Sequence, residues 1–144
     1  MKHKILISVF AAMSALTACS QASAPDTSIA TAQAAKTKAV LIYADWCGSC
    51  KILDPKIKAI QAKGPIAGLE FVTLDYTAKD DADFYKQAEA AGVGDAVKTY
   101  LGGKVKTGQL VLVDLDDKTV IGKVTKTSEP ADIITAFKAA VAAS

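Results

Sequence analysis

The sequence predicts an α/β domain in which helices flank both faces of one central mixed β-sheet. Continuous apolar runs of strand length are typical of strands buried on both faces. A long segment with helical spacing separates the first two runs, and such a crossover joins parallel strands. Two closely spaced strands then precede a last helix. The predicted core order is strand, helix, strand, helix, strand, strand, helix, and a short additional helix is expected after the second one.

The first half of the domain alternates strand and helix. Residues 39–44 form an apolar run that predicts a buried strand, and a helix is expected over residues 47–63. Its apolar positions recur at helical spacing: Ile52, Leu53, Ile57 and Ile60. Pro55 is expected to kink this helix, and the Gly-Pro pair at residues 64–65 ends it. Residues 69–76 predict a second strand, parallel to the first.

Two more helices are expected before the next strand. The first covers residues 81–91, with Gly92 placed to close it. The second is short and covers residues 95–101, and the glycines at residues 102–103 end it. Because these helices follow the second parallel strand, they complete a second crossover unit of the predicted α/β architecture.

A hairpin and a helix complete the predicted domain. Residues 109–114 and 119–125 read as two strands that an acidic turn joins. Ser128 as N-cap and Pro130 in the first turn are expected to start a helix that reaches Ala142. Its apolar face holds four residues: Ile133, Ile134, Phe137 and Val141.

The charge balance excludes several classes of function. Lys and Arg number 17, and Asp and Glu number 15. Lys2 and Lys4 lie in a segment expected to be removed, so the mature chain is near neutral and carries no basic stripe for nucleic acid. The single histidine, His3, lies in the same segment. A catalytic Ser–His or Cys–His pair is therefore excluded from the mature domain.

Two cysteines stand where the first strand gives way to the first helix. The unpaired N–H groups and partial positive charge of a helix N-terminus stabilise an anion. Cys47 would lie at that end, so we expect the pKa of its thiol to fall below the free value of about 8.5. Cys50 lies one helical turn further on the same face and can close a disulfide with Cys47. The pair predicts thiol–disulfide exchange.

Other uses of such a cysteine pair fit the sequence less well. Structural zinc usually takes four Cys or His ligands. The chain holds three Cys and one His, and that His3 lies in the segment expected to be removed, so a structural zinc site is disfavoured. Covalent haem needs a histidine directly after the second cysteine, where Lys51 stands. A disulfide that closes so short a loop stabilises the fold little. A carrier or binding module that holds a soft metal ion without redox turnover stays open as the alternative.

The run Trp-Cys-Gly-Ser-Cys-Lys at residues 46–51, with Ala44 before it and Pro55 after it, resembles the active-site segment of the thioredoxin family. The resemblance implies a thioredoxin-like fold and the activity of a thiol–disulfide oxidoreductase. It implies catalytic roles for Cys47 and Cys50, and it calls for no metal or other cofactor. The cysteine at position 47 would attack a substrate disulfide, and the second cysteine would resolve the mixed disulfide.

The resemblance also implies a substrate surface and partners. The candidate substrate-binding residues are Trp46, Gly48, Ser49, Thr107 and Gly108. The partners expected are protein thiols and disulfides, together with an upstream membrane protein that exchanges electrons with the pair. We expect the protein to act as a monomer.

Three positions depart from the family pattern. Family members usually carry a cis-proline before the third core strand, in a loop that faces the disulfide and offers backbone atoms to the substrate. Gly108 takes that position here, and no proline lies between Pro65 and Pro130. Leu41 stands where many members carry a buried carboxylate thought to help the second thiol lose its proton. Ser49 replaces the proline often found between the cysteines. We therefore expect a less rigid loop and proton transfer through water or another group.

The N-terminal segment resembles a bacterial lipoprotein leader. Residues 1–18 combine a basic start with a short apolar stretch, and Cys19 follows a lipobox-like Leu-Thr-Ala. The resemblance implies cleavage before Cys19, lipidation of that residue and attachment at the periplasmic face of a bacterial membrane. Cleavage after the Ala-Ser-Ala at residues 22–24 would instead release a soluble periplasmic protein. Residues 19–38 are expected to be a flexible tether, and residues 39–144 the thioredoxin-like domain.

Overall fold

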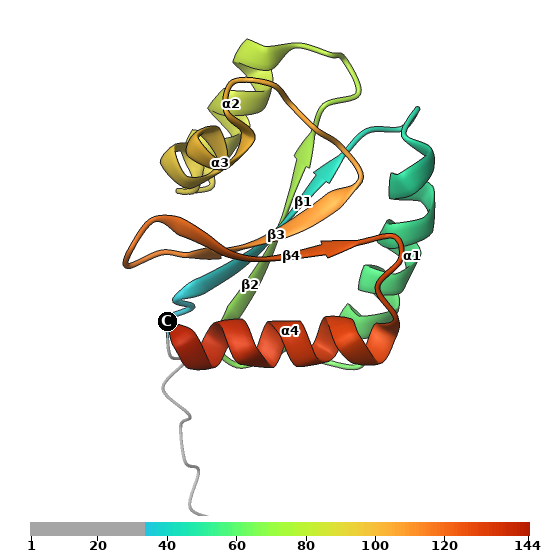
Figure 1. The fold of residues 1–144 in the computed structure, drawn as a ribbon, viewed down its shortest axis with the longest axis vertical. Helices are drawn as coiled ribbons and strands as arrows, with labels where there is room; N and C mark the ends of the chain where they lie inside the picture. Colours follow the sequence, from blue (N-terminus) through green and yellow to red (C-terminus); the bar gives the residue numbers. More distant parts are fainter. Residues whose placement is uncertain (1–33) are drawn as a thin grey trace, which may run out of the picture. The chain divides into compact units, whose positions relative to one another are not determined.

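A computed structural model describes residues 34–144, in which one four-stranded mixed sheet lies between two layers of helices (Figure 1). The elements are β1 (Thr37–Tyr43), α1 (Gly48–Gln61), β2 (Leu69–Asp75), α2 (Asp81–Ala90), α3 (Gly94–Leu101), β3 (Gln109–Asp114), β4 (Thr119–Thr125) and α4 (Pro130–Ala143). This element order confirms the predicted fold class and agrees with the fold that the family resemblance implies.

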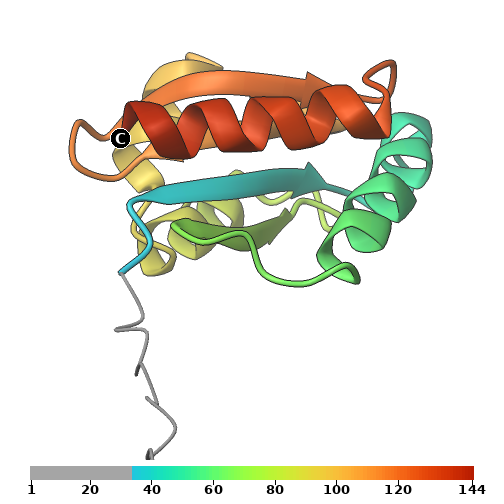
Figure 2. The same cartoon turned by 90° about the horizontal axis from the view of Figure 1, so that it is seen from below.

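The strands lie in the order β2-β1-β3-β4. Strand β1 pairs in parallel with β2, and β3 pairs antiparallel with β4, as the long crossover and the hairpin predict. Strand β1 also pairs antiparallel with β3. In the register between β1 and β3, Ile42 lies opposite Gln109. The carboxyl end of β1 therefore meets the beginning of β3, and Figure 2 shows β1 running toward α1.

Side chains alternate between the two faces of β3 and divide the core into two layers. Leu110 and Leu112 pack against α1 and α4, whereas Val111 and Val113 pack against α2 and α3. Every residue of β3 is buried. In Figure 1, α2 and α3 lie on one side of the sheet and α4 on the other. A strand covered on both faces in this way explains the unbroken apolar run in the sequence.

The structure corrects the ends of two predicted elements. Strand β1 begins at Thr37 rather than at residue 39, so part of the expected tether belongs to the sheet. The Thr37 side chain is buried, and its hydroxyl lies within hydrogen-bonding distance, 2.7 Å, of the Ser144 hydroxyl. Helix α1 ends at Gln61, and Ile52, expected on its apolar face, is 50% exposed. The inward face of α1 instead begins with Cys50, which is buried one turn before Leu53.

The N-cap of α4 is also corrected. Glu129, and not Ser128, occupies the N-cap position, and Pro130 is in the first turn as expected. The Ser128 hydroxyl instead accepts a hydrogen bond from the Thr125 N–H at 3.3 Å. Ser128 therefore closes the turn between β4 and α4, because its short polar side chain can satisfy backbone groups in turns as well as at helix ends.

The expected leader at residues 1–18, Cys19 and most of the expected tether lie outside the described residues. Among residues 34–144, none of the helices has the length and apolar character that a membrane span requires.

Two adjacent residues of α1 test the orientation of this helix. Leu53→Ala should lower the free energy of unfolding by about 2–5 kcal/mol, because Leu53 is fully buried under the sheet. Ile52→Ala should change it by less than about 0.5 kcal/mol, because that side chain is half exposed. Urea unfolding of both oxidised variants measures the difference. Similar losses of unfolding free energy in the two variants would contradict this orientation of α1.

Candidate active site

Cys47 lies at the junction between β1 and α1. Its N–H donates to the Ala44 carbonyl at 3.2 Å, which turns the chain out of the strand. It occupies the N-cap of α1 with an extended backbone, and its Sγ accepts the Cys50 N–H at 3.2 Å. A sulfur atom thus fills the capping role that a side-chain oxygen usually has. In the reduced protein, this N–H and the helix dipole favour the thiolate of Cys47.

Cys50 lies in the first turn of α1 and is joined to Cys47 by a disulfide, with their Cα atoms 5.2 Å apart. Cys50 is fully buried, whereas Cys47 keeps 7% of its surface exposed. The Cys50 Sγ lies 3.7 Å from the Ile42 carbonyl oxygen. Because Cys50 is fully buried, an external group can approach only Cys47, and this difference in access is compatible with the predicted attacking and resolving roles.

The loop before β3 brings Gly108 against the disulfide. Its N–H donates to the Ile42 carbonyl at 2.9 Å, and its φ of +82° lies in the left-handed region. A Cβ at this position would stand 3.1 Å from Cys47 Sγ and 2.6 Å from Ser49 Cβ. Proline can supply neither this N–H nor this φ. Glycine is therefore required for the path of this loop, whose peptide bonds are trans, as throughout residues 34–144.

Trp46 is exposed but is held on the loop between β2 and α2. Its indole N–H donates to the Thr77 carbonyl at 3.0 Å, and the Lys79 ammonium lies 4.9 Å from the ring centroid. Tyr76 packs edge-on against the indole. The Tyr76 hydroxyl donates to the Asp81 carboxylate at 2.6 Å, and this hydrogen bond raises the pKa of the phenol above its ordinary value. Tyr76 stays neutral at physiological pH, and Trp46 has a fixed orientation beside the disulfide.

The other predicted site residues lie near the pair in different environments. Gly48 is exposed, and a Cβ there would meet no atom within 4 Å. Ser49 is half-buried against Gly108. Thr107 is partly buried and precedes Gly108 in the loop. The structure thus brings the candidate substrate-binding residues to one end of the sheet, and their contact with a substrate stays a prediction.

Cys50 packs in a small cluster with Ala44, Cys47 and the partly buried Tyr43. Leu41 is buried in the core layer that α1 and α4 cover. Within residues 34–144, the buried acidic residue is Asp114, at the far end of β3 from Gln109. Asp114 accepts the N–H groups of Asp116 and Asp117 and so stabilises the β3–β4 turn. A proton that leaves Cys50 must therefore pass to water or to the substrate.

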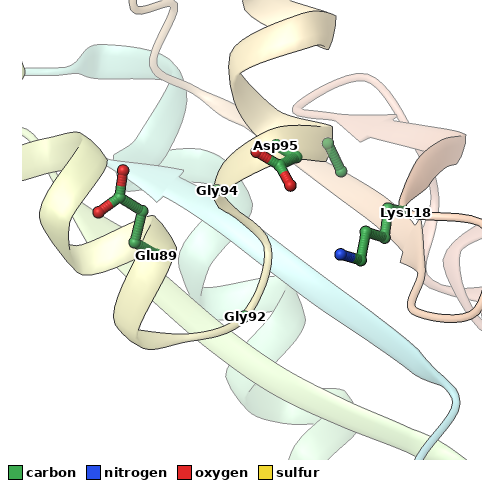
Figure 3. Close-up of a pocket in the computed structure, with 6 residues that line it drawn as sticks. Glu89, Gly92, Gly94, Asp95 and Lys118 are labelled. Atoms are coloured by element: carbon green, nitrogen blue, oxygen red, sulfur yellow. The ribbon is translucent and has the colours of Figure 1, made fainter.

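The metal-carrier alternative finds no third ligand in the described part of the chain. No three His, Cys, Asp or Glu side chains come together among residues 34–144. A metal ion held by Cys47 and Cys50 would have to complete its coordination with groups from elsewhere. A separate hollow lies between the end of α2, the start of α3 and the β3–β4 turn, where Figure 3 shows Glu89, Asp95 and Lys118. It contains none of the predicted site residues.

Sequence reasoning missed the contribution of the β2–α2 loop. Thr77 and Lys79 lie about thirty residues after Trp46, and no local motif marks them. The available signal was the parallel pairing of β1 with β2, since parallel strands place their carboxyl ends at the same edge of a sheet.

Comparisons with known proteins give one matching family and a set of similar solved structures. The family model for thioredoxin matches residues 21–93. No sequence among the curated proteins matches the chain. Solved structures similar to the chain include thioredoxin f2 of Chlamydomonas reinhardtii, with 20% identity over 73% of this chain and 78% of that chain and a TM-score of 0.44. Thioredoxin f of spinach chloroplasts has 19% identity over 80% and 87%, with a TM-score of 0.46. StoA from Bacillus subtilis has 10% identity over 73% and 84%, with a TM-score of 0.49.

Two glycines with similar backbone angles test the close approach at position 108. Gly103→Ala should cost about 1–2 kcal/mol of stability, because φ is +85° but a Cβ there meets nothing within 4 Å. Gly108→Ala should cost more and should also slow disulfide exchange, because the new methyl group displaces the loop from Cys47 and Ser49. Urea unfolding and insulin reduction measure the two effects. Equal stability losses with unchanged exchange in Gly108→Ala would contradict the contact.

Proposed function

We propose, because the chain belongs to the thioredoxin family, that this thiol–disulfide oxidoreductase exchanges disulfides with proteins at the periplasmic face of a bacterial membrane. The observation that carries the proposed chemistry is the Cys47–Cys50 disulfide at the N-terminus of α1, with one sulfur accessible and the other buried. The membrane location rests on the lipobox-like sequence before Cys19.

The first step joins Cys47 to the substrate. The Cys47 thiolate attacks one sulfur of a substrate disulfide, a new S–S bond forms, and the other substrate sulfur leaves as a thiolate. The Cys50 N–H, 3.2 Å from Cys47 Sγ, and the other free N–H groups of the first turn stabilise the attacking anion. The leaving thiolate takes a proton from water or from Cys50.

The second step releases the substrate. The Cys50 thiolate attacks Cys47 Sγ, the intramolecular disulfide forms, and the bond between Cys47 and the substrate breaks. The second substrate sulfur leaves as a thiolate and takes a proton from water. The substrate has then gained two electrons and two protons, while the cysteine pair has lost two electrons and the Cys50 proton, so water supplies the remaining proton. Until that step, the Ile42 carbonyl, 3.7 Å from Cys50 Sγ, can accept a hydrogen bond from the Cys50 thiol and so favour its neutral form. The reverse sequence oxidises a substrate dithiol.

The fold is suited to a tether that leaves the site open. The tether would enter at Thr37, and β1 then runs seven residues before it reaches the Cys47 end. At about 3.3 Å per residue, the point of entry lies roughly 20 Å or more from the disulfide. An anchored domain therefore presents the cysteine pair away from its attachment point, toward a protein substrate or a membrane electron donor.

Single cysteine variants test the two roles. Cys47→Ser should abolish insulin reduction, because no accessible sulfur remains to attack. Cys50→Ser should accumulate mixed disulfides with partner proteins, because the adduct on Cys47 cannot be resolved. Non-reducing electrophoresis and mass spectrometry measure the trapped species, and the double variant is the control that should capture none. A wild-type protein that is inactive on insulin and holds one copper or zinc ion after anaerobic purification would support the carrier instead.

The N-terminus of the mature protein tests the anchor. Protein from the membrane fraction should begin at a diacylated Cys19, and Cys19→Ser should lose both the lipid mass and membrane association. Mass spectrometry of the intact mature chain makes this measurement. A mature chain that begins at Pro25, without lipid, would show the soluble form and overturn the anchor, while the exchange chemistry would be unaffected.

A further inference from the structure

Gln109 is a buried polar residue at the start of an otherwise apolar strand segment. Its side-chain amide makes two hydrogen bonds. Nε2 donates to the Lys106 carbonyl at 3.0 Å, and Oε1 accepts the Tyr100 hydroxyl at 3.1 Å. A buried amide is costly to leave without partners, so these bonds fix both ends of the group. One end holds the loop before β3, and the other holds α3.

The alternation of β3 explains this arrangement. Gln109 shares a strand face with Val111, which packs in the layer covered by α2 and α3. Tyr100 lies on α3, one residue before its end, so its hydroxyl reaches the same face. The amide of Gln109 therefore spans the two ends of the loop at residues 102–108, which connects α3 to β3.

The loop has little stiffness of its own. Gly102, Gly103 and Gly108 all have positive φ, and glycine is the residue with the widest backbone freedom. Among the residues that the structure describes, Gln109 makes the one side-chain hydrogen bond to residues 102–108, and Val105 adds a partly buried apolar contact. A backbone bond from Gly108 to Ile42 completes the attachment on the site side.

This loop contacts Cys47 directly and shares a hydrogen-bond acceptor with Cys50. Gly108 packs on Cys47, and the Ile42 carbonyl that accepts its N–H also faces Cys50 Sγ. Thr107, partly exposed, makes no main-chain hydrogen bond within residues 34–144. Its free N–H and C=O lie one residue from the contact with Cys47. They are placed to pair with the extended backbone of a polypeptide whose sulfur has reached the site.

We propose that Gln109 is a positioning residue that holds Thr107 and Gly108 against the disulfide and so favours polypeptide disulfides over small ones. Gln109 touches neither sulfur and acts through the loop. A polypeptide substrate needs the Thr107 main chain in place, whereas a small disulfide needs only Cys47. The inference rests on the exchange activity proposed above and adds to that same site a residue outside the cysteine segment that positions its loop.

Two variants separate positioning from general stability. Gln109→Met keeps the length of the side chain and removes both hydrogen bonds, and Tyr100→Phe removes one. Val113→Ala, at the far end of the same strand, is the matched control for a loss of core packing. For each full chain in the reduced state, stopped-flow fluorescence of Trp46 gives second-order rate constants with insulin and with cystamine, a small disulfide. The readout is the ratio of the two constants, which a loss of stability does not alter.

The insulin-to-cystamine ratio should fall roughly tenfold in Gln109→Met and about threefold in Tyr100→Phe, as expected for the loss of two hydrogen bonds and one. The ratio should not change in Val113→Ala. An unchanged ratio in an active Gln109→Met protein overturns the positioning role. If that variant does not fold, an unchanged ratio in Tyr100→Phe overturns it equally. A wild-type protein that reacts with neither disulfide instead overturns the proposed function.

Discussion

The structure depends on the turn at which β1 passes into α1. Strand β1 is paired on both sides and buried on both faces, so the position of its carboxyl end is fixed. The turn from Ala44 to Cys47 then places a sulfur at the N-terminus of α1, where the Cys50 N–H points at it. The same strand supplies the Ile42 carbonyl, which contacts Cys50 and binds the loop at Gly108. One strand therefore positions both sulfurs and the loop that covers them.

Much of the fold could be predicted because strand and helix periods are local properties of the chain. The bounds of β3 and β4 agree with the sequence pattern, since turn residues and glycines flank each apolar run. The errors lie where tertiary contacts decide. Thr37 looks like tether by composition, but pairing with Leu69 of β2 and Asp114 of β3 makes it part of the sheet. Ser128 has the chemistry of an N-cap, but the Thr125 N–H uses its hydroxyl instead.

The candidate site, like the fold, has features that the local sequence predicts and features that only tertiary contacts decide. The position of Cys47 and Cys50 was predictable because a junction and a three-residue spacing are written in the sequence. The fixed orientation of Trp46 was not, because its partner Thr77 comes from the next parallel strand. The φ of Gly108 was not predictable either. Glycine permits many loop paths, and only the contact with Ser49 and Cys47 shows which path this chain takes.

The loop position that Gly108 occupies can be ordered in two physical ways, by a proline or by a glycine. Proline restricts the backbone through its own ring, so the order is local and survives changes elsewhere. Glycine supplies an N–H that proline lacks, and here that group binds the Ile42 carbonyl at 2.9 Å. The order of such a loop comes from its neighbours, through the Gln109 amide and α3. Local opening of α3 would therefore remove one of the supports of the loop and leave the bond from Gly108 to Ile42 to hold it at the disulfide, a coupling that a proline would weaken.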